Sequence, residues 1–292
     1  MAANNLIDQF KTASVLIKLI VVNALAFIAI RLFSFFLQIT PSAFTKWFTL
    51  PDSFGEFIVQ PWSFITYGFI HFDFFHVLFN MLWLYWFGNM VLNLFAGKRL
   101  LTIYFLGAIS GGLLFVLSYN VFPVFENARG YLLGASGAVM AIIVFMATYS
   151  PNTEVRIFTF RIKIWHIAIV KIGLDLLQLT SGNNAGGMLA HLGGAAFGFV
   201  YARQLVKGND IGKWFEQLMD GFMNLFSTRK RRPFKKVHRT TTQASSKRST
   251  TKETKSEHQQ RVDRILDKIG KSGYESLTKA EKDFLFKAGK DN

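Results

Sequence analysis

Six long apolar runs limit what this sequence can fold into. Each is close to the roughly 20 residues that a helix needs to cross the core of a lipid bilayer. A chain that is 51% hydrophobic, with 32 Phe, is typical of an integral membrane protein. We therefore predict an all-α polytopic membrane protein built on a six-helix bundle. The expected spans are Leu16–Leu37, His76–Phe95, Leu100–Tyr119, Leu132–Tyr149, Ile164–Leu179 and Met188–Leu205.

The positions of Lys and Arg between the runs support this count. The fifth run is the weakest, because it is short and contains Lys171 and Asp175. Without it, however, the basic tail would lie on the outer side. With six spans, the outer segments carry only Lys46 and Arg129, and the other loop cations lie inside, as is usual for cytoplasmic loops. We expect a multi-pass protein of a bacterial inner (plasma) membrane with both termini cytoplasmic.

The net charge of +15 is concentrated in the C-terminal part of the chain. Residues 1–202 hold 11 Lys and Arg against 7 Asp and Glu, whereas residues 203–292 hold 22 against 11. A basic tail after the last span is typical of a segment that contacts anionic lipid on the cytoplasmic side. We therefore expect a lipid partner at the tail and no nucleic acid.

Composition divides the chain into four parts. Residues 1–207 hold the six spans, and residues 208–239 hold an amphipathic helix, Lys213–Phe226, with the basic run Arg229–Arg232. Residues 240–257 are rich in Ser, Thr, Lys and Gln and predict a disordered linker. Residues 258–292 predict a small helical hairpin whose second helix starts with a capping box, Thr278 and Glu281. This hairpin is too short to bury a core alone and is typical of a docking element.

Two polar side chains stand out in the later spans. Ser136 lies in Gly134-Ala135-Ser136-Gly137 at the head of the fourth span, and His191 lies near the head of the sixth. An alcohol is a weak nucleophile unless a base takes its proton, and an imidazole can do so. A lone Ser or His in a span more often bonds to a helix. Their shared depth favours a nucleophile and its base.

A stripe of small residues predicts which helices pack together. Gly194, Gly198 and Ala202 follow His191 on nearly one helical face, and such a face lets another helix approach closely. His191 extends this stripe. Gly134 and Gly137 would let the serine helix be the partner, so we expect these two helices to pack through these residues.

The second span adds polar groups at the same depth. His76 and Asn80 are four residues apart and so share one helical face. With the Ser136 backbone N–H, both can donate hydrogen bonds to a developing oxyanion. Interhelical hydrogen bonding is the alternative for Asn80.

Metal and cofactor chemistry is not expected. The chain has no Cys, and His71 and His76 are off-face with no His-Glu-x-x-His motif. A site built from His71, His76 and His191 stays open but would leave Ser136 without a role. Lys171 and Asp175, four residues apart, predict a buried ion pair, and the alternative is that Asp175 orients His191.

Together these motifs make the chain resemble a rhomboid intramembrane serine protease across roughly residues 60–205. The matching segments are Gly134–Gly137, Ala190–Gly194 with Gly198, and His71-x4-His76-x3-Asn80. The resemblance implies Ser136 as nucleophile, His191 as its dyad partner, and His76 and Asn80 at the oxyanion. It also implies a water-filled cavity open to the outside and single-span membrane proteins as substrates. Two positions depart from the family: Trp62-Ser63 replaces a Trp-Arg pair, and Met140 replaces an aromatic.

The sequence therefore predicts an intramembrane serine endopeptidase that needs no cofactor. The alternative is a catalytically silent rhomboid-like protein that binds membrane clients, although such a protein would have no use for both Ser136 and His191. A transporter would favour broken helices at mid-membrane, whereas these polar groups are shallow. The sequence leaves the substrate and the oligomeric state open.

Overall fold

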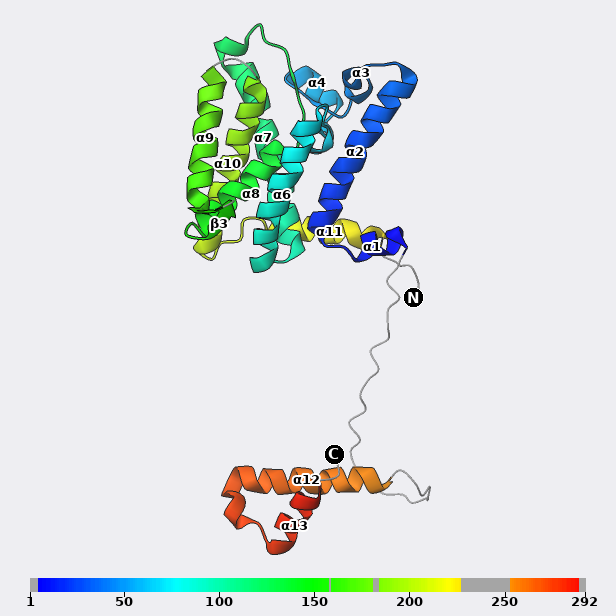
Figure 1. The fold of residues 1–292 in the computed structure, drawn as a ribbon, viewed down its shortest axis with the longest axis vertical. Helices are drawn as coiled ribbons and strands as arrows, with labels where there is room; N and C mark the ends of the chain where they lie inside the picture. The colour runs from blue at the N-terminus through cyan, green and yellow to red at the C-terminus, as the bar shows by residue number, and fades with distance from the viewer. Residues whose placement is uncertain (1–4, 158, 181–183, 227–252, 289–292) are drawn as a thin grey trace. The chain divides into compact units, whose positions relative to one another are not determined.

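The computed structural model describes residues 5–157, 159–180, 184–226 and 253–288. The chain separates into two units, residues 1–229 and residues 230–292. The first unit is a helical bundle (Figure 1) in which a long helix occupies the place of each predicted span. These helices are α2 (Val15–Leu37), α6 (Phe74–Leu94), α7 (Gly97–Val121), α8 (Ser136–Tyr149), α9 (Ile164–Thr180) and α10 (Ala185–Val206).

The helices differ in how well they suit a membrane. Among the described residues, α2, α6, α7 and α10 are long and apolar enough to cross a bilayer. Helix α8 is apolar but has only 14 residues, and α9 has 17 residues and carries Lys171 and Asp175. The chain is thus a multi-pass membrane protein with four candidate spans, and the count of six stays a prediction.

Helix α8 forms the centre of the bundle. Every residue from Gly137 to Ala147 is buried, and α6, α7, α9 and α10 all pack against this helix. A helix that is apolar on all sides is the kind that a bundle buries completely. The four surrounding helices therefore fix the position of the residues at the N-terminal end of α8.

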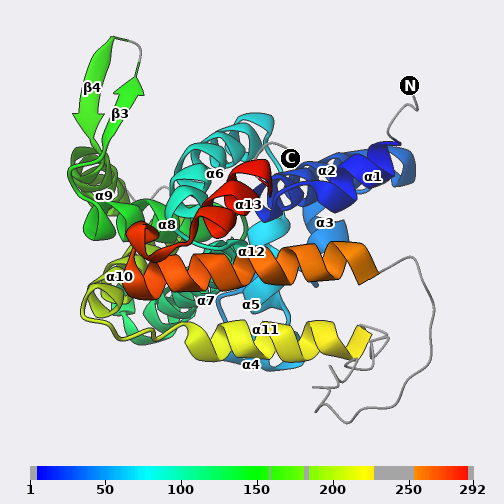
Figure 2. The same ribbon diagram turned by 90° about the horizontal axis from the view of Figure 1, so that it is seen from below.

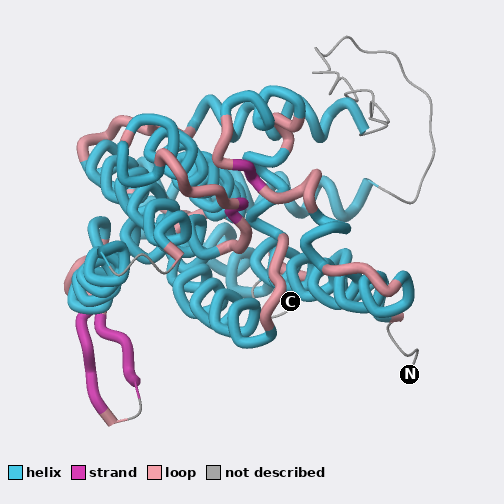
Figure 3. The backbone as a smooth tube through the Cα atoms, turned by 90° about the horizontal axis from the view of Figure 1, so that it is seen from above, coloured by secondary structure: helices cyan, strands magenta, loops and turns pink. Residues whose placement is uncertain are grey.

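The chain is mostly helical, as the sequence predicts, and it also forms two short antiparallel strand pairs. Strand β1 (Leu50–Pro51) pairs with β2 (Tyr131–Leu132), and β3 (Glu154–Ile157) pairs with β4 (Phe160–Lys163). Figure 3 shows β1 and β2 among the helices. The β3–β4 hairpin joins α8 to α9 and projects from the bundle beside α9 (Figure 2).

The start of α8 also differs from the prediction. The fourth apolar run begins at Leu132, but the helix begins at Ser136 because Leu132 pairs with Leu50. Gly134 then has a φ of +108° and donates its N–H to the Tyr67 carbonyl oxygen at 2.9 Å. Side chains rarely tolerate such a backbone conformation, and the helix cannot continue backward through it. Ser136 is therefore the first residue of the helix.

The long loop between α2 and α6 is a folded cap at one end of the bundle (Figure 1). Its indole and hydroxyl groups bond back to its own backbone: Trp62 Nε1 donates to the Trp47 carbonyl at 2.7 Å, and Thr66 Oγ1 donates to the Phe48 carbonyl at 2.8 Å. The short elements of this loop are α3 (Pro41–Thr45), β1, α4 (Phe54–Val59), α5 (Ser63–Thr66) and the 3₁₀ turn η1 (Tyr67–Phe69). A second 3₁₀ turn, η2 (Pro123–Phe125), follows α7.

The opposite end of the bundle carries α1 (Leu6–Thr12), the β3–β4 hairpin and α11 (Lys213–Phe226) (Figure 1). Helix α11 covers the same residues as the predicted amphipathic helix. Arg161 and Lys163 of β4, which were predicted to lie inside, belong to this end. The apolar side chains of α11, such as Leu218 and Phe222, are largely exposed, which suits a helix at a membrane surface.

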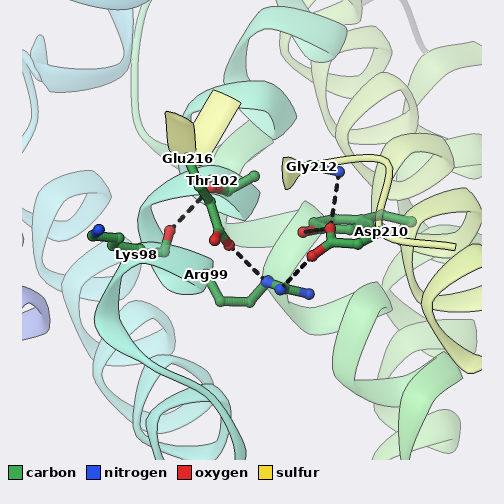
Figure 4. A network of polar contacts seen from close by, with 7 residues as sticks. Lys98, Arg99, Thr102, Asp210, Gly212 and Glu216 are labelled. Atoms are coloured by element: carbon green, nitrogen blue, oxygen red, sulfur yellow. Dashed lines mark hydrogen bonds and ion pairs between the residues drawn. The ribbon is translucent and has the colours of Figure 1, made fainter. Parts of the chain in front are cut away.

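Arg99, at the start of α7, attaches α11 to the bundle (Figure 4). Its Nη2 lies 2.6 Å from Asp210 Oδ2, and its Nε lies 2.9 Å from Glu216 Oε1. Asp210 Oδ1 in turn accepts the Tyr201 hydroxyl at 3.0 Å and the Gly212 N–H at 3.1 Å. One guanidinium therefore joins the start of α7, the end of α10 and the first turn of α11.

The second unit contains α12 (Glu253–Ser272), the turn η3 (Tyr274–Ser276) and α13 (Lys279–Ala288). Both bonds of the predicted capping box are present: the Thr278 N–H donates to Glu281 Oε2 at 2.8 Å, and the Glu281 N–H donates to Thr278 Oγ1 at 3.3 Å. Lys268 of α12 also pairs with Glu281 at 2.9 Å. Most of the predicted linker, residues 240–252, and the basic run Arg229–Arg232 lie outside the described residues, and α12 begins within the last part of that linker.

We predict that Arg99→Gln destabilises the protein more than Lys98→Gln. Arg99 is only 15% exposed and its loss strands two partly buried carboxylates, which should cost about 2 kcal/mol in free energy of unfolding. Lys98 pairs with Asp220 at 51% exposure, so its loss should cost less than about 1 kcal/mol. Unfolding of the two purified variants in detergent measures both costs. Equal losses would contradict this role for Arg99.

Candidate active site

A cavity of about 890 Å³ lies between α6, α8, α9 and α10 and is lined by the predicted catalytic and oxyanion residues. Ser136, His191, His76 and Asn80 line its wall. Met140, four residues after Ser136, lines it as well. The four polar groups come from three helices that are far apart in the sequence, so the fold brings together what the sequence had only placed at one depth.

Glycine contacts between α8 and α10 set the relation of Ser136 to His191. A Cβ at Gly194 would collide with the Gly137 carbonyl oxygen, and one at Gly198 would collide with the Ala141 carbonyl oxygen. The Ala190 carbonyl oxygen lies 3.2 Å from the Cβ position of Gly137, so the neighbours of the two candidate residues touch. Ala202, the third predicted packing residue, is fully buried.

Ser136 and His191 face one cavity without a direct bond. The hydrogen bonds of the described part of the chain do not include one between the Ser136 hydroxyl and the His191 imidazole. In enzymes without bound substrate, such catalytic bonds are often long and tighten only when substrate is present. Ser136 and His191 therefore line the same pocket, and we expect the hydrogen bond between them to form when substrate binds.

His191 is held from the side of α9. Its Nδ1 lies 3.0 Å from Asp175 Oδ1, and Lys171 Nζ lies 2.7 Å from the same oxygen. The sequence left two alternatives for this pair, a buried ion pair or an acid that orients the histidine. The structure contains both contacts, because one carboxylate oxygen bridges the Lys and the His.

Gly134 allows His76 to lie directly beside the turn that precedes Ser136. A methyl group at Gly134 would lie 2.7 Å from His76 Cε1 and 2.9 Å from His76 Nε2, closer than atoms can approach. Asn80 Nδ2 is 3.9 Å from the same position. His76 and Asn80 of α6 thus both lie next to Gly134, two residues before Ser136.

His71 is the residue whose role the sequence did not predict. It is fully buried, and its Nε2 accepts the Ala135 N–H at 3.2 Å and lies 3.2 Å from Asn80 Nδ2. Because a backbone N–H can only donate, Nε2 must be the unprotonated nitrogen, and Asn80 donates to it as well. His71 therefore ties Asn80 to the residue before Ser136. In the sequence, His71 was noticed only as part of the His71-x4-His76-x3-Asn80 series. That spacing could not predict that His71 contacts Asn80 and Ala135.

Burial and the neighbouring His76 imidazole lower the pKa of His71 to about 3. It is therefore neutral at physiological pH, as an acceptor for the Ala135 N–H must be. With Nε2 occupied in this way, His71 does not offer that nitrogen to a metal. The described residues also hold no group of three His, Cys, Asp or Glu side chains placed to bind one.

The N-terminal end of α8 adds a favourable field for negative charge. Ser136 is the first helical residue, and the preceding Ala135 has no side-chain hydrogen bond that would cap the free N–H groups of the first turn. Such N–H groups and the helix dipole stabilise an anion nearby. An alcohol, an imidazole and several donors around one cavity are the groups that acyl transfer needs.

Comparisons with known proteins match two parts of the chain to family models. The model of the rhomboid domain matches residues 59–208, which include every residue of the site. A second model, of a family of unknown function (DUF6576), matches residues 249–287, which include α12 and all but the last residue of α13.

Curated relatives carry rhomboid names. The chain is 33% identical over 156 residues to RHOMBOID-like protein 12, mitochondrial, of Arabidopsis thaliana, which covers 49% of this chain and 46% of the relative. It is 29% identical over 182 residues to the presenilin-associated rhomboid-like protein, mitochondrial, of Bos taurus, covering 60% and 46%. Rhomboid-like protein 16, chloroplastic, of Arabidopsis thaliana is 28% identical over 158 residues, covering 49% of each. The chain thus spans about half the length of these relatives.

We predict opposite effects for two glycine substitutions in helices. Gly194→Ala should destabilise the protein, because its methyl group would push α10 away from the Gly137 carbonyl oxygen. Gly173→Ala on α9 meets nothing within 4 Å and should stabilise the protein by about 0.5–1 kcal/mol, since Ala favours a helix. Thermal unfolding of both purified variants gives the two signs. A stable Gly194→Ala variant would show that α8 and α10 do not need this close approach.

Proposed function

The chain belongs to the rhomboid family, and on that premise we propose that it is an intramembrane serine endopeptidase. Its substrates would be single-span membrane proteins, cut in or near their transmembrane segments. The observation that carries the proposal is the meeting of Ser136 from α8 and His191 from α10 in one cavity that His76 and Asn80 also line. A protein that only bound clients would have no use for a hydroxyl and an imidazole placed in this way.

The proposed reaction begins with attack by Ser136 Oγ on the carbonyl carbon of the scissile peptide bond. His191 Nε2 takes the hydroxyl proton as the C–O bond forms, and the carbonyl electrons move to its oxygen. The tetrahedral intermediate then collapses, the C–N bond breaks, and the imidazolium gives its proton to the leaving amine. A water molecule releases the acyl group from Ser136 by the same steps, with His191 again as base.

The negative oxygen of the intermediate needs donors that are already in place. We assign this role to His76, Asn80 and the Ser136 backbone N–H. Support comes from the position of His76 and Asn80 beside Gly134, and from Ser136 at the positive end of α8. A single donor to such an oxyanion is typically worth about 3 kcal/mol in the transition state.

Orientation and compartment belong to the proposal as well. We infer that six helices cross the membrane, that the cavity faces the outer side, and that both termini are cytoplasmic in a bacterial inner membrane. The Lys and Arg distribution supports this orientation, because Lys98 and Arg99 at the start of α7 and the basic residues of β4 lie at the end opposite the folded cap. The curated relatives named above are mitochondrial and chloroplastic, so the bacterial compartment rests on the sequence prediction alone.

The proposed organisation keeps the boundaries drawn from the sequence except between linker and hairpin, because α12 already begins at Glu253. Residues 1–207 form the protease domain, 208–239 the amphipathic helix and basic segment, and 253–292 the hairpin. We propose that the basic segment contacts anionic lipid and that the hairpin acts as a docking element. The separate second-family match over residues 249–287 supports a distinct module there.

The central prediction is that Ser136 and His191 act as one unit. Ser136→Ala and His191→Ala should each abolish cleavage of a transmembrane substrate, and the double variant should be no worse than either single variant, because the histidine has no catalytic task without its nucleophile. Purified variants in detergent, assayed on one fluorogenic single-span substrate, measure this.

Ser110→Ala is the matched control. The Ser110 hydroxyl donates to the Gly193 carbonyl at 2.9 Å from α7, so it contacts α10 without lining the cavity. This variant should retain cleavage. Cleavage by Ser136→Ala at a rate near that of the unaltered protein would rule out the serine mechanism. A folded protein that cleaves no transmembrane substrate would favour the client-binding alternative.

A further inference from the structure

The contact between Asp175 and His191 goes beyond what a two-residue mechanism needs. Asp175 lies on α9 with a side chain only 1% exposed, and its Oδ1 is 3.0 Å from Nδ1 of His191 on α10. Lys171, on the same helix, already neutralises the charge of this carboxylate without His191. The Asp175 Oδ2 is buried and has no partner among the described residues, so a single oxygen serves both Lys171 and His191.

This contact selects one tautomer of His191. An ionised carboxylate can only accept hydrogen bonds, so the proton of a neutral imidazole beside it must be on Nδ1. Nε2 then carries the lone pair that a base needs. Lys171 Nζ lies 3.4 Å from Nδ1 and can only donate. A hydrogen bond from Lys171 would therefore require the other tautomer, in which Nε2 carries the proton and cannot act as a base. The shorter distances from Asp175 Oδ1 to Nδ1, 3.0 Å, and to Nζ, 2.7 Å, favour Lys171 donating to the acid.

The charges around His191 also match a base that must become positive. Asp175 and Lys171 face it from α9, His76 faces the cavity from α6, and Ser136 faces it from α8. The carboxylate is closer to the ring than the ammonium is, so it would stabilise an imidazolium. Lys171 offsets part of this effect, and it fixes the carboxylate in place.

We propose that Asp175 is a positioning residue that completes a Ser136–His191–Asp175 triad, with Lys171 holding the carboxylate. The inference rests on the proposed function, since it assigns how the base of that reaction is oriented. Asp175 never touches substrate and acts only through His191. The chain would thus combine the rhomboid fold with a three-residue arrangement.

Two variants separate this role from a merely structural ion pair. Asp175→Asn keeps the shape but lets an amide N–H face Nδ1, and Lys171→Met removes the ion pair while leaving the acid on the histidine. We expect kcat of Asp175→Asn to fall at least about a hundredfold with little change in KM, compared with on the order of ten-thousandfold in Ser-His-Asp enzymes. Lys171→Met should lower kcat less than Asp175→Asn does, since the acid remains in contact with His191.

The pH dependence of kcat is a second measurement, and a loss of folding stability alone would not change it. Removing the negative charge makes an imidazolium less stable, so the acid limb of Asp175→Asn should shift to lower pH. Removing the positive charge of Lys171 should shift the acid limb to higher pH. Both variants and the unaltered full-length protein are assayed in detergent on one fluorogenic single-span substrate, and the thermal midpoint of each is recorded.

Each outcome decides the proposal. Acid limbs that move in opposite directions, with the large kcat loss only in Asp175→Asn, support it. Equal losses in both variants that follow the thermal midpoints, or a normal kcat for Asp175→Asn, overturn it. If Asp175→Asn does not fold, Asp175→Ser takes its place: a large kcat loss with an acid limb at lower pH supports the triad, and a normal kcat with an unmoved limb overturns it. Cleavage that survives Ser136→Ala would instead refute the proposed function.

Discussion

The close approach of α8 and α10 is the constraint on which the site depends. Gly194 and Gly198 place α10 directly against the carbonyl oxygens of Gly137 and Ala141, with no side chain between the two backbones. Without a hydrophobic force between helices in lipid, such close packing is a main source of attraction between them. Because Ser136 and His191 lie one and three residues from these contacts, the same packing that stabilises the core also fixes how far apart they can be.

A second layer of contacts fixes the turn before Ser136. The β1–β2 pair holds Leu132, the Tyr67 carbonyl holds the Gly134 N–H, and His71 holds the Ala135 N–H. These three residues before Ser136 are therefore bound to three different parts of the segment between α2 and α6. Gly134 at positive φ is what allows the chain to turn sharply here while His76 lies against it. The site is thus built on groups that are already in place before substrate binds, as strong electrostatic catalysis requires.

Much of this was predictable from the sequence, and the parts that were not have a common physical reason. The apolar runs predicted all six of the main helices, because residues that are buried or face lipid are apolar. The shared depth of the four polar residues Ser136, His191, His76 and Asn80 followed from where those runs begin. The start of α8 at Ser136, the role of His71 and the contact of Asp175 with His191 depend on side chains from distant segments meeting in three dimensions. Spacing along one helix cannot specify such a meeting. Short strand pairs, such as β1–β2, are likewise set by long-range register and carry almost no local pattern.

The most direct test of the account is covalent labelling of the full-length protein in detergent with a serine-directed fluorophosphonate, followed by peptide mass spectrometry. An activated Ser136 should carry the adduct, and the adduct should be lost in His191→Ala because the hydroxyl then has no base. Ser110, which bonds to the Gly193 carbonyl, should stay unmodified. An adduct at Ser136 that forms equally well without His191, or no adduct at Ser136 in a folded protein, would contradict the claim that these two residues form a catalytic pair.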